Sequence, residues 1–368
     1  MLQTAQIAAV RAVLAAAPDG ALRTLEAALR ADAGGSRAML VRDLIETELT
    51  ERLARDGVFA PVLAVCGPPR HAAGIQLFPP WAPARLWAVL KRVASEETQS
   101  VLAGVAPELA ASVQNRLCLR AAAGLRTGEP GFAAAMDGLE PSAVSQLALA
   151  LELAPLTRAA LEEMPAWFAR ATGAHVAAMR LAYKDAARLG EGAGPLLMEM
   201  LLAALDEPWR VLQLVAWVMD RPDERFVADS ELAGLVRRVI EAVEVEVAAV
   251  KAVDFSRGPS AGLEAARAVE AGLAGVAAAE RALTLKRGPW SDQVRKQRAA
   301  LSGAAEARLR EAEALVNALL PRPPMKIAGR SFGADSRFET APEPEVMLQG
   351  GALMTFLSET RAAAEGGG

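Results

Sequence analysis

The side chains that most often carry acid–base or metal chemistry near neutral pH are scarce in this chain. It has two histidines, His71 and His175, and one tyrosine, Tyr183. No metal-binding His-Glu-x-x-His, Glu-x-x-His or Cys-x-x-Cys spacing occurs, and no phosphate-binding Gly-x-x-x-x-Gly-Lys-Ser/Thr loop is present. The sequence therefore favours a protein that is not an enzyme. We assign it no catalytic residue, no metal ligand and no cofactor.

Cys66 and His71 lie five positions apart in a proline-rich segment. A thiolate beside an imidazole is nucleophilic. Pro68 and Pro69 intervene, however, and no third residue orients the pair, so we favour a buried cysteine and a surface histidine. Cys118 is the only other cysteine. Two cysteines in a chain of this length predict free thiols and a cytoplasmic location, in a bacterial type of cytosol.

Asp220, Asp223 and Glu224 resemble an acidic metal site at a helix end. A second acidic motif is missing, and Arg221 and Arg225 would neutralise the group. We therefore interpret these carboxylates as part of a helix boundary.

A basic cluster lies in the last third of the chain: Lys286, Arg287, Arg295, Lys296 and Arg298. Such a cluster can contact phosphates or an anionic membrane surface. The net charge is −4, which does not suggest a polyanion as partner. We predict no nucleic-acid partner, and we expect the cluster to pair with Glu241, Glu244 and Glu246 of the preceding helix.

The composition predicts an all-α fold. Hydrophobic residues make up 52% of the chain and aromatic residues only 4%, so Ala, Leu and Val dominate. Ala and Leu have the highest helix propensities, and Ala lets helices approach closely. No run of about 18 uncharged apolar residues occurs, so we expect no membrane span.

The most regular segment is 229–255, where apolar residues recur at steps of four and three, as on one face of a helix. This stripe consists of Leu232, Val236, Val239, Val243, Val247, Val250 and Val253. Two further helices are expected over 260–286 and 291–320, and the three predict a long antiparallel bundle. In the middle one, Ala-Gly pairs ending at Gly262, Gly272 and Gly275 predict close approach of a neighbour.

The first part of the chain predicts shorter helices separated by prolines and glycines. One helix is expected to end near Arg55, followed by a proline-rich, apolar loop over 57–83 that packs on the helices. Three short helices are expected over 142–154, 156–163 and 166–171. The predicted organisation is an irregular, solenoid-like helical domain over 1–190 and a long-helix bundle domain over 191–320. A mobile tail over 321–368 completes it.

The tail contains an apolar segment that predicts a protein-binding motif. The candidate partner-binding residues are Met347, Leu348, Leu353, Met354, Phe356 and Leu357, together with Trp81 of the proline-rich loop. The sequence leaves open whether this segment docks on its own chain or on another protein.

The function that the sequence favours is a non-enzymatic helical scaffold or adaptor that binds a protein partner and is compatible with a homo-oligomer. The alternative is a helical enzyme or small-ligand-binding protein. Its pocket is expected between the two helical regions, near Trp81, Tyr183 and Gly190.

Overall fold

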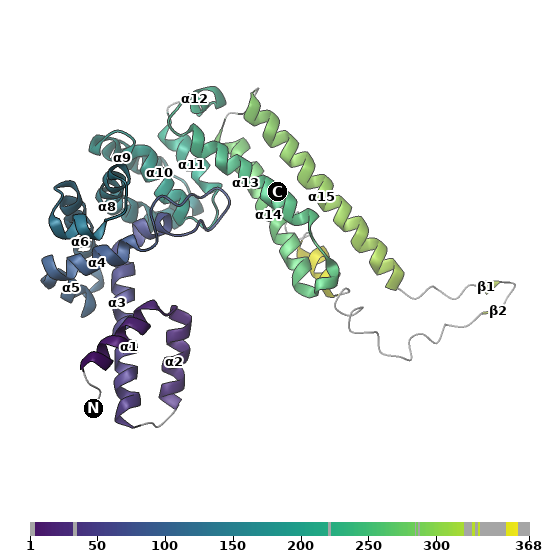
Figure 1. Cartoon of the computed structure of the whole chain (residues 1–368). Coiled ribbons are helices and arrows are strands. Elements are labelled where there is room, and N and C mark those ends of the chain that lie inside the picture. Colours follow the sequence, from purple (N-terminus) through teal and green to yellow (C-terminus); the bar gives the residue numbers. More distant parts are fainter. Residues whose placement is uncertain are drawn as a thin grey trace. The chain divides into compact units, whose positions relative to one another are not determined.

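The computed structural model describes residues 4–31, 35–219, 222–283, 285, 288–319, 326–327, 330–331 and 351–359. These residues are almost entirely helical, as the composition predicts (Figure 1). The exception is an antiparallel pair of two-residue strands, β1 (Lys326–Ile327) and β2 (Arg330–Ser331). None of the described helices combines the length and the apolar composition that crossing a membrane requires.

The helices of the first half are α1 (Thr4–Ala16), α2 (Asp19–Ala31), α3 (Ser36–Cys66), α4 (Ala82–Val93), α5 (Ser95–Leu102), α6 (Pro107–Arg126), α7 (Pro130–Ala135) and α8 (Pro141–Ala169). Those of the second half are α9 (Gly173–Leu189), α10 (Ala193–Ala204), α11 (Arg210–Val218), α12 (Glu224–Ala228), α13 (Ala233–Lys251), the 3-10 helix η1 (Phe255–Arg257), α14 (Pro259–Ala282) and α15 (Pro289–Leu319). Several begin with proline, whose missing N–H costs nothing in the first turn.

The chain divides into two compact units. Unit 1 comprises Met1–Pro68, Ile75–Ala166 and Ala182–Met200. Unit 2 comprises Pro69–Gly74, Trp167–Leu181 and Leu201–Gly368. The division falls within α8, α9 and α10, whereas the sequence predicts a single boundary after residue 190.

In unit 1, helix α3 continues beyond Arg55 to Cys66, so the expected end of this helix is wrong. Pro61 lies inside it and has no N–H to donate to the carbonyl oxygen of Gly57, four residues earlier. Arg158 supplies the missing donor, because its Nη1 lies 3.1 Å from that oxygen. Its Nη2 donates to the carbonyl oxygen of Val58 over 2.9 Å. A side chain distant in sequence therefore compensates for the proline.

Helix α8 is likewise one continuous helix through Pro155 and Pro165, where the sequence predicts three short ones. Its apolar side is buried at Leu147, Leu151 and Leu153. Burying each such side chain contributes about 1.5–3 kcal/mol, which is comparable to the roughly 3 kcal/mol that each of the two interior prolines costs.

The proline-rich segment after α3 packs against the helices of unit 1 from Ile75 onward, as predicted. Phe78 is fully buried. The N–H groups of Leu77 and Phe78 both donate to the carbonyl oxygen of Val65, at 2.9 and 3.0 Å. The last turn of α3 is thereby closed by the loop that follows it.

In unit 2, helices α13, α14 and α15 pack against one another in all three pairs (Figure 1). The stripe predicted on α13 is buried from Leu232 to Val250, and Val253 packs at the edge of the core. Helix α13 begins later than expected, because Asp229 ends α12 and the hydroxyl of Ser230 accepts from the N–H of Leu232 over 3.2 Å.

The predicted close approaches to α14 are confirmed. A Cβ atom at Gly272 would lie 2.8 Å from the side chain of Leu301 on α15. A Cβ atom at Gly275 would lie 2.9 Å from Val243 on α13. Both distances are shorter than real Cβ contacts, so these glycines let the helices pack closely.

Candidate functional site

Residues 351–359 form a short helix, hereafter the C-terminal helix, which lies against α14 (Figure 1). Ala352, Leu353 and Phe356 are fully buried there. The surface that receives them, hereafter the docking surface, consists of Phe255, Gly262, Ala265, Ala266, Leu309 and Ala312. The apolar segment of the tail therefore docks on its own chain in this structure.

Gly262 sets how closely the C-terminal helix approaches α14. A Cβ atom at this position would lie 1.8 Å from the carbonyl oxygen of Ala352 and 2.8 Å from the N atom of Phe356. Both are backbone atoms, which cannot rotate away as a flexible side chain can. Glycine is therefore required at this position if the two helices are to remain in contact.

An aromatic pair anchors the C-terminal helix. The rings of Phe255 and Phe356 are 5.6 Å apart between centroids and are inclined by 50°. This tilted arrangement is one of the favourable geometries for aromatic rings, and it adds to the burial of both side chains. Isolated helices shorter than about 12–15 residues are marginal in water, so the docking surface must supply most of the order of this helix.

The predicted partner-binding residues do not all lie in one place. Leu353 and Phe356 lie on the docking surface, and Leu357 is half-buried. Met354 points away, with 63% of its surface exposed. Met347 and Leu348 lie outside the described residues. Trp81 belongs to unit 1, where it is half-buried beneath the guanidinium of Arg85, 4.0 Å from the ring centroid.

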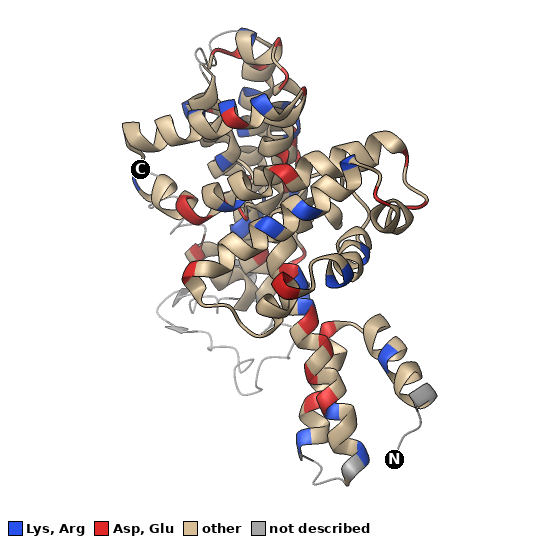
Figure 2. Ribbon diagram, turned by 90° about the vertical axis from the view of Figure 1, so that its left-hand side faces the viewer, with Lys and Arg blue, Asp and Glu red and all other residues tan. Residues whose placement is uncertain are grey.

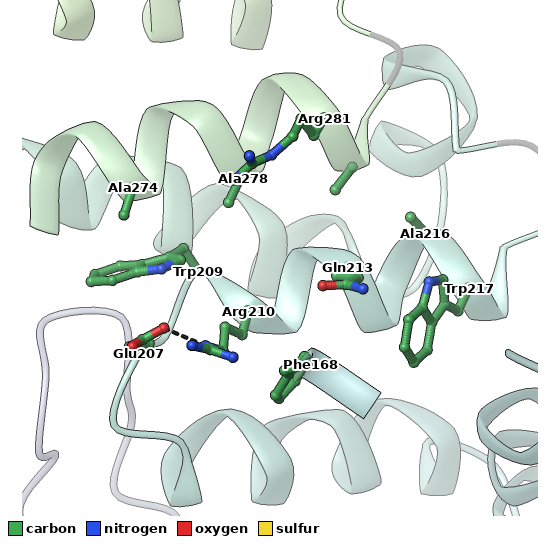
Figure 3. Close-up of a pocket in the computed structure, with 11 residues that line it drawn as sticks. Phe168, Glu207, Trp209, Arg210, Gln213, Ala216, Trp217, Ala274, Ala278 and Arg281 are labelled. Atoms are coloured by element: carbon green, nitrogen blue, oxygen red, sulfur yellow. Dashed lines mark hydrogen bonds and ion pairs between the residues drawn. The ribbon is translucent and has the colours of Figure 1, made fainter. Parts of the chain in front are cut away.

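A second candidate site in unit 2 is a groove between α11 and α14 with a volume of 590 Å³ (Figure 3). Helix α11 and the turn before it contribute Glu207, Trp209, Arg210, Gln213, Ala216 and Trp217 to the lining. Helix α14 contributes Ala274, Ala278, Arg281 and Ala282. Phe168 completes the lining. This groove was not predicted from the sequence. The signal was the spacing of Arg210, Gln213 and Trp217, at steps of three and four.

The pocket expected between the two helical regions, near Trp81, Tyr183 and Gly190, stays a prediction. Within unit 1 a hollow of 360 Å³ lies beside Gly190 and Gly192. Neither Trp81 nor Tyr183 lines it. The ring of Tyr183 instead packs against Gly194, where a Cβ atom would lie 2.8 Å from it. Gly190 and Gly192 have positive φ values of 154° and 75°, as suits the tight turn before α10.

Of the acidic residues at the helix boundary, Glu224 has a defined structural role. Its side chain is buried, and its carboxylate accepts hydrogen bonds from the N–H groups of Trp290 (2.6 Å) and Ser291 (3.3 Å). These groups belong to the first turn of α15, which has no capping side chain next to it in sequence. Glu224 therefore caps a helix that starts 65 positions later. Asp220 lies outside the described residues.

Two members of the basic cluster form ion pairs within unit 2, with other carboxylates than expected. Arg295 pairs with Asp292, and Arg298 pairs with Glu280. Glu244 instead accepts from the amides of Gln293 (3.3 Å) and Gln297 (3.4 Å). The side chains of Lys286 and Arg287 are not among those described.

The thiol and imidazole groups are held in structural roles. Burial raises the pKa of the Cys66 thiol to about 12, so the thiol stays protonated at neutral pH and is a poor nucleophile. The Nε2 atom of His71 lies 3.0 Å from the carbonyl oxygen of Leu202. Among the described residues, no three His, Cys, Asp or Glu side chains cluster as a metal site.

Lys and Arg are mixed with Asp and Glu along most of the helices (Figure 2). This distribution agrees with the small net charge of −4. No family model matches the chain, and neither the curated proteins nor the solved structures include a match.

Proposed function

We propose that the protein is a non-enzymatic helical adaptor whose docking surface recognises an amphipathic helix of a protein partner. The docked C-terminal helix is the observation that supports this proposal. In this structure the surface on α14, η1 and α15 holds a short helix of the same chain, with a small residue, a leucine and an aromatic residue at the positions of Ala352, Leu353 and Phe356. Helix-in-groove binding of this kind is a common mode of peptide recognition.

In this proposal the C-terminal helix is an intramolecular competitor for the partner. A tether gives an attached ligand an effective concentration of about 1 mM. With a net docking free energy of about 3 kcal/mol, the same helix supplied as a free peptide would bind with a Kd of about 10 μM. A partner must bind more tightly than this or engage a form in which the C-terminal helix is released.

We further interpret α13, α14 and α15 as an antiparallel three-helix bundle that holds the docking surface rigid. The mutual packing of the three helices supports this interpretation. The helices of unit 1 we interpret as an irregular, solenoid-like array. A cytoplasmic location is part of the proposal, supported by two free and buried cysteines, Cys66 and Cys118.

The proposal predicts that a fluorescein-labelled peptide of residues 346–360 binds to the full chain carrying Phe356→Asp. The substitution places a charge where the docking surface is apolar, so the C-terminal helix is released and the surface is left open. Fluorescence anisotropy should give a Kd of about 10 μM for this variant and at least tenfold weaker binding to the unaltered chain. Adding Gly262→Ala to Phe356→Asp should abolish binding, because the new Cβ atom occupies the position of the Ala352 carbonyl.

Absence of peptide binding to the folded Phe356→Asp chain would overturn the proposal. Equal binding to the Gly262→Ala double variant would show that the peptide binds elsewhere. Size-exclusion chromatography of the unaltered chain distinguishes a further arrangement, in which the C-terminal helix docks on a second copy and forms a homo-oligomer. The apparent mass should be that of a monomer if docking is internal.

A further inference from the structure

The groove between α11 and α14 has no residue in common with the docking surface, and its walls differ in character. Ala274 and Ala278 form a low wall on α14, while Trp217 and Phe168 stand opposite (Figure 3). The ring of Trp217 packs against the buried Trp167, with 6.2 Å between ring centroids. A flat apolar group fits between a wall of small side chains and a wall of fixed rings.

The charged side chains of the groove leave one positive charge unmatched. Arg210 pairs with Glu207 and lies over the ring of Phe168, 4.9 Å from its centroid. Arg281 has no ion pair or hydrogen bond to any described residue, and its side chain reaches along the groove above Ala278 (Figure 3). The net charge of the described lining is therefore +1.

Gln213 adds a polar group at the middle of the groove (Figure 3). It is half-buried and makes no hydrogen bond to a described residue. Its amide can donate and accept, so it can complete the hydrogen bonds of an anion held by Arg281. A guanidinium matches a carboxylate in shape and binds it with two parallel hydrogen bonds.

From this combination we propose that the groove binds a small aromatic monocarboxylate. Its ring lies between Trp217 and the alanines of α14, and its carboxylate accepts from Arg281 and Gln213. The volume of 590 Å³ lies within the range of about 300–1,000 Å³ that is typical of small-molecule sites. The site is a binding site only, and no catalytic step is assigned to it.

The test is isothermal titration of the full chain with 2-naphthoate, a small aromatic monocarboxylate. We expect saturable one-to-one binding with a Kd of about 1 mM or below. Arg281→Gln should weaken it about tenfold, since a charge-assisted hydrogen bond is lost. The neutral analogue 2-naphthamide should bind this variant and the unaltered chain equally, because Arg281 has no charge to neutralise in that ligand.

Arg267→Gln is the matched control. Arg267 is exposed on the same helix, α14, and lies outside the groove, so this substitution removes the same charge without touching the site. Unchanged affinity for 2-naphthoate in this variant, with the loss in Arg281→Gln, supports the proposal. Equal weakening by both substitutions, or no saturable binding by the unaltered chain, would overturn it.

Discussion

Replacing Val243 with aspartate is expected to lower the free energy of unfolding by about 3–5 kcal/mol. Val243 is only 6% exposed, and its side chain fills the space that Gly275 leaves on α14. An aspartate there would place a carboxylate in a buried position, where loss of its hydration is costly. Urea unfolding followed by circular dichroism measures the change.

Val245→Asp is the control for this prediction. Val245 lies two residues further along α13, with 51% of its surface exposed. The same substitution there should change the stability by no more than about 0.5 kcal/mol. If Val243→Asp were as mild as Val245→Asp, the stripe on α13 would not form the core of unit 2.

Arg158→Ala is expected to cost about 3 kcal/mol of stability. The substitution removes the donors to the carbonyl oxygens of Gly57 and Val58, at 3.1 and 2.9 Å. The thiol of Cys118 still donates to Val58, but Gly57 then has no described donor because Pro61 lacks an N–H. Thermal and urea unfolding of the purified variant measure the loss.

A double substitution separates this hydrogen-bonding role from packing. In the Arg158→Ala background, Pro61→Ala restores a backbone N–H four residues after Gly57, so it should recover about 1 kcal/mol. In the unaltered chain the same change should recover less, because Arg158 already occupies that carbonyl. Equal effects of Pro61→Ala in both backgrounds would contradict the compensation that we infer.

The elements predicted correctly from the sequence are those fixed by local pattern. The stripe on α13 was predictable because apolar residues at steps of three and four lie on one face of a helix, whichever neighbour covers that face. The glycines of α14 also indicated close contact, although the sequence did not show that a helix from the tail would lie on Gly262. The predicted helix ends were wrong in α3 and α8. Prolines at 61, 155 and 165 predict breaks, but the helices continue through them.

These features could not be predicted because side chains distant in sequence supply the hydrogen bonds that the local backbone lacks. Arg158 donates to the carbonyl oxygen of Gly57, which Pro61 leaves without a backbone donor, from 101 positions away. Glu224 caps the first turn of α15 from 66 positions away. The groove was missed because it needs α11 and α14 to be brought together before its lining can be recognised. Neither the Arg158 contact nor the Glu224 contact has a signature within a short window of sequence.

The most direct test of the docked C-terminal helix is amide hydrogen exchange of residues 351–359, followed by mass spectrometry in the full chain. In the unaltered chain these amides should exchange more slowly than in the free peptide, because the docking surface holds the helix. Gly262→Ala should remove the protection, since its Cβ atom would lie 1.8 Å from the Ala352 carbonyl oxygen. Gly303→Ala on α15, where a Cβ atom meets nothing within 4 Å, should leave it intact. Exchange of residues 351–359 at the free-peptide rate in the unaltered chain, or equal protection in the Gly262→Ala chain, would contradict the account.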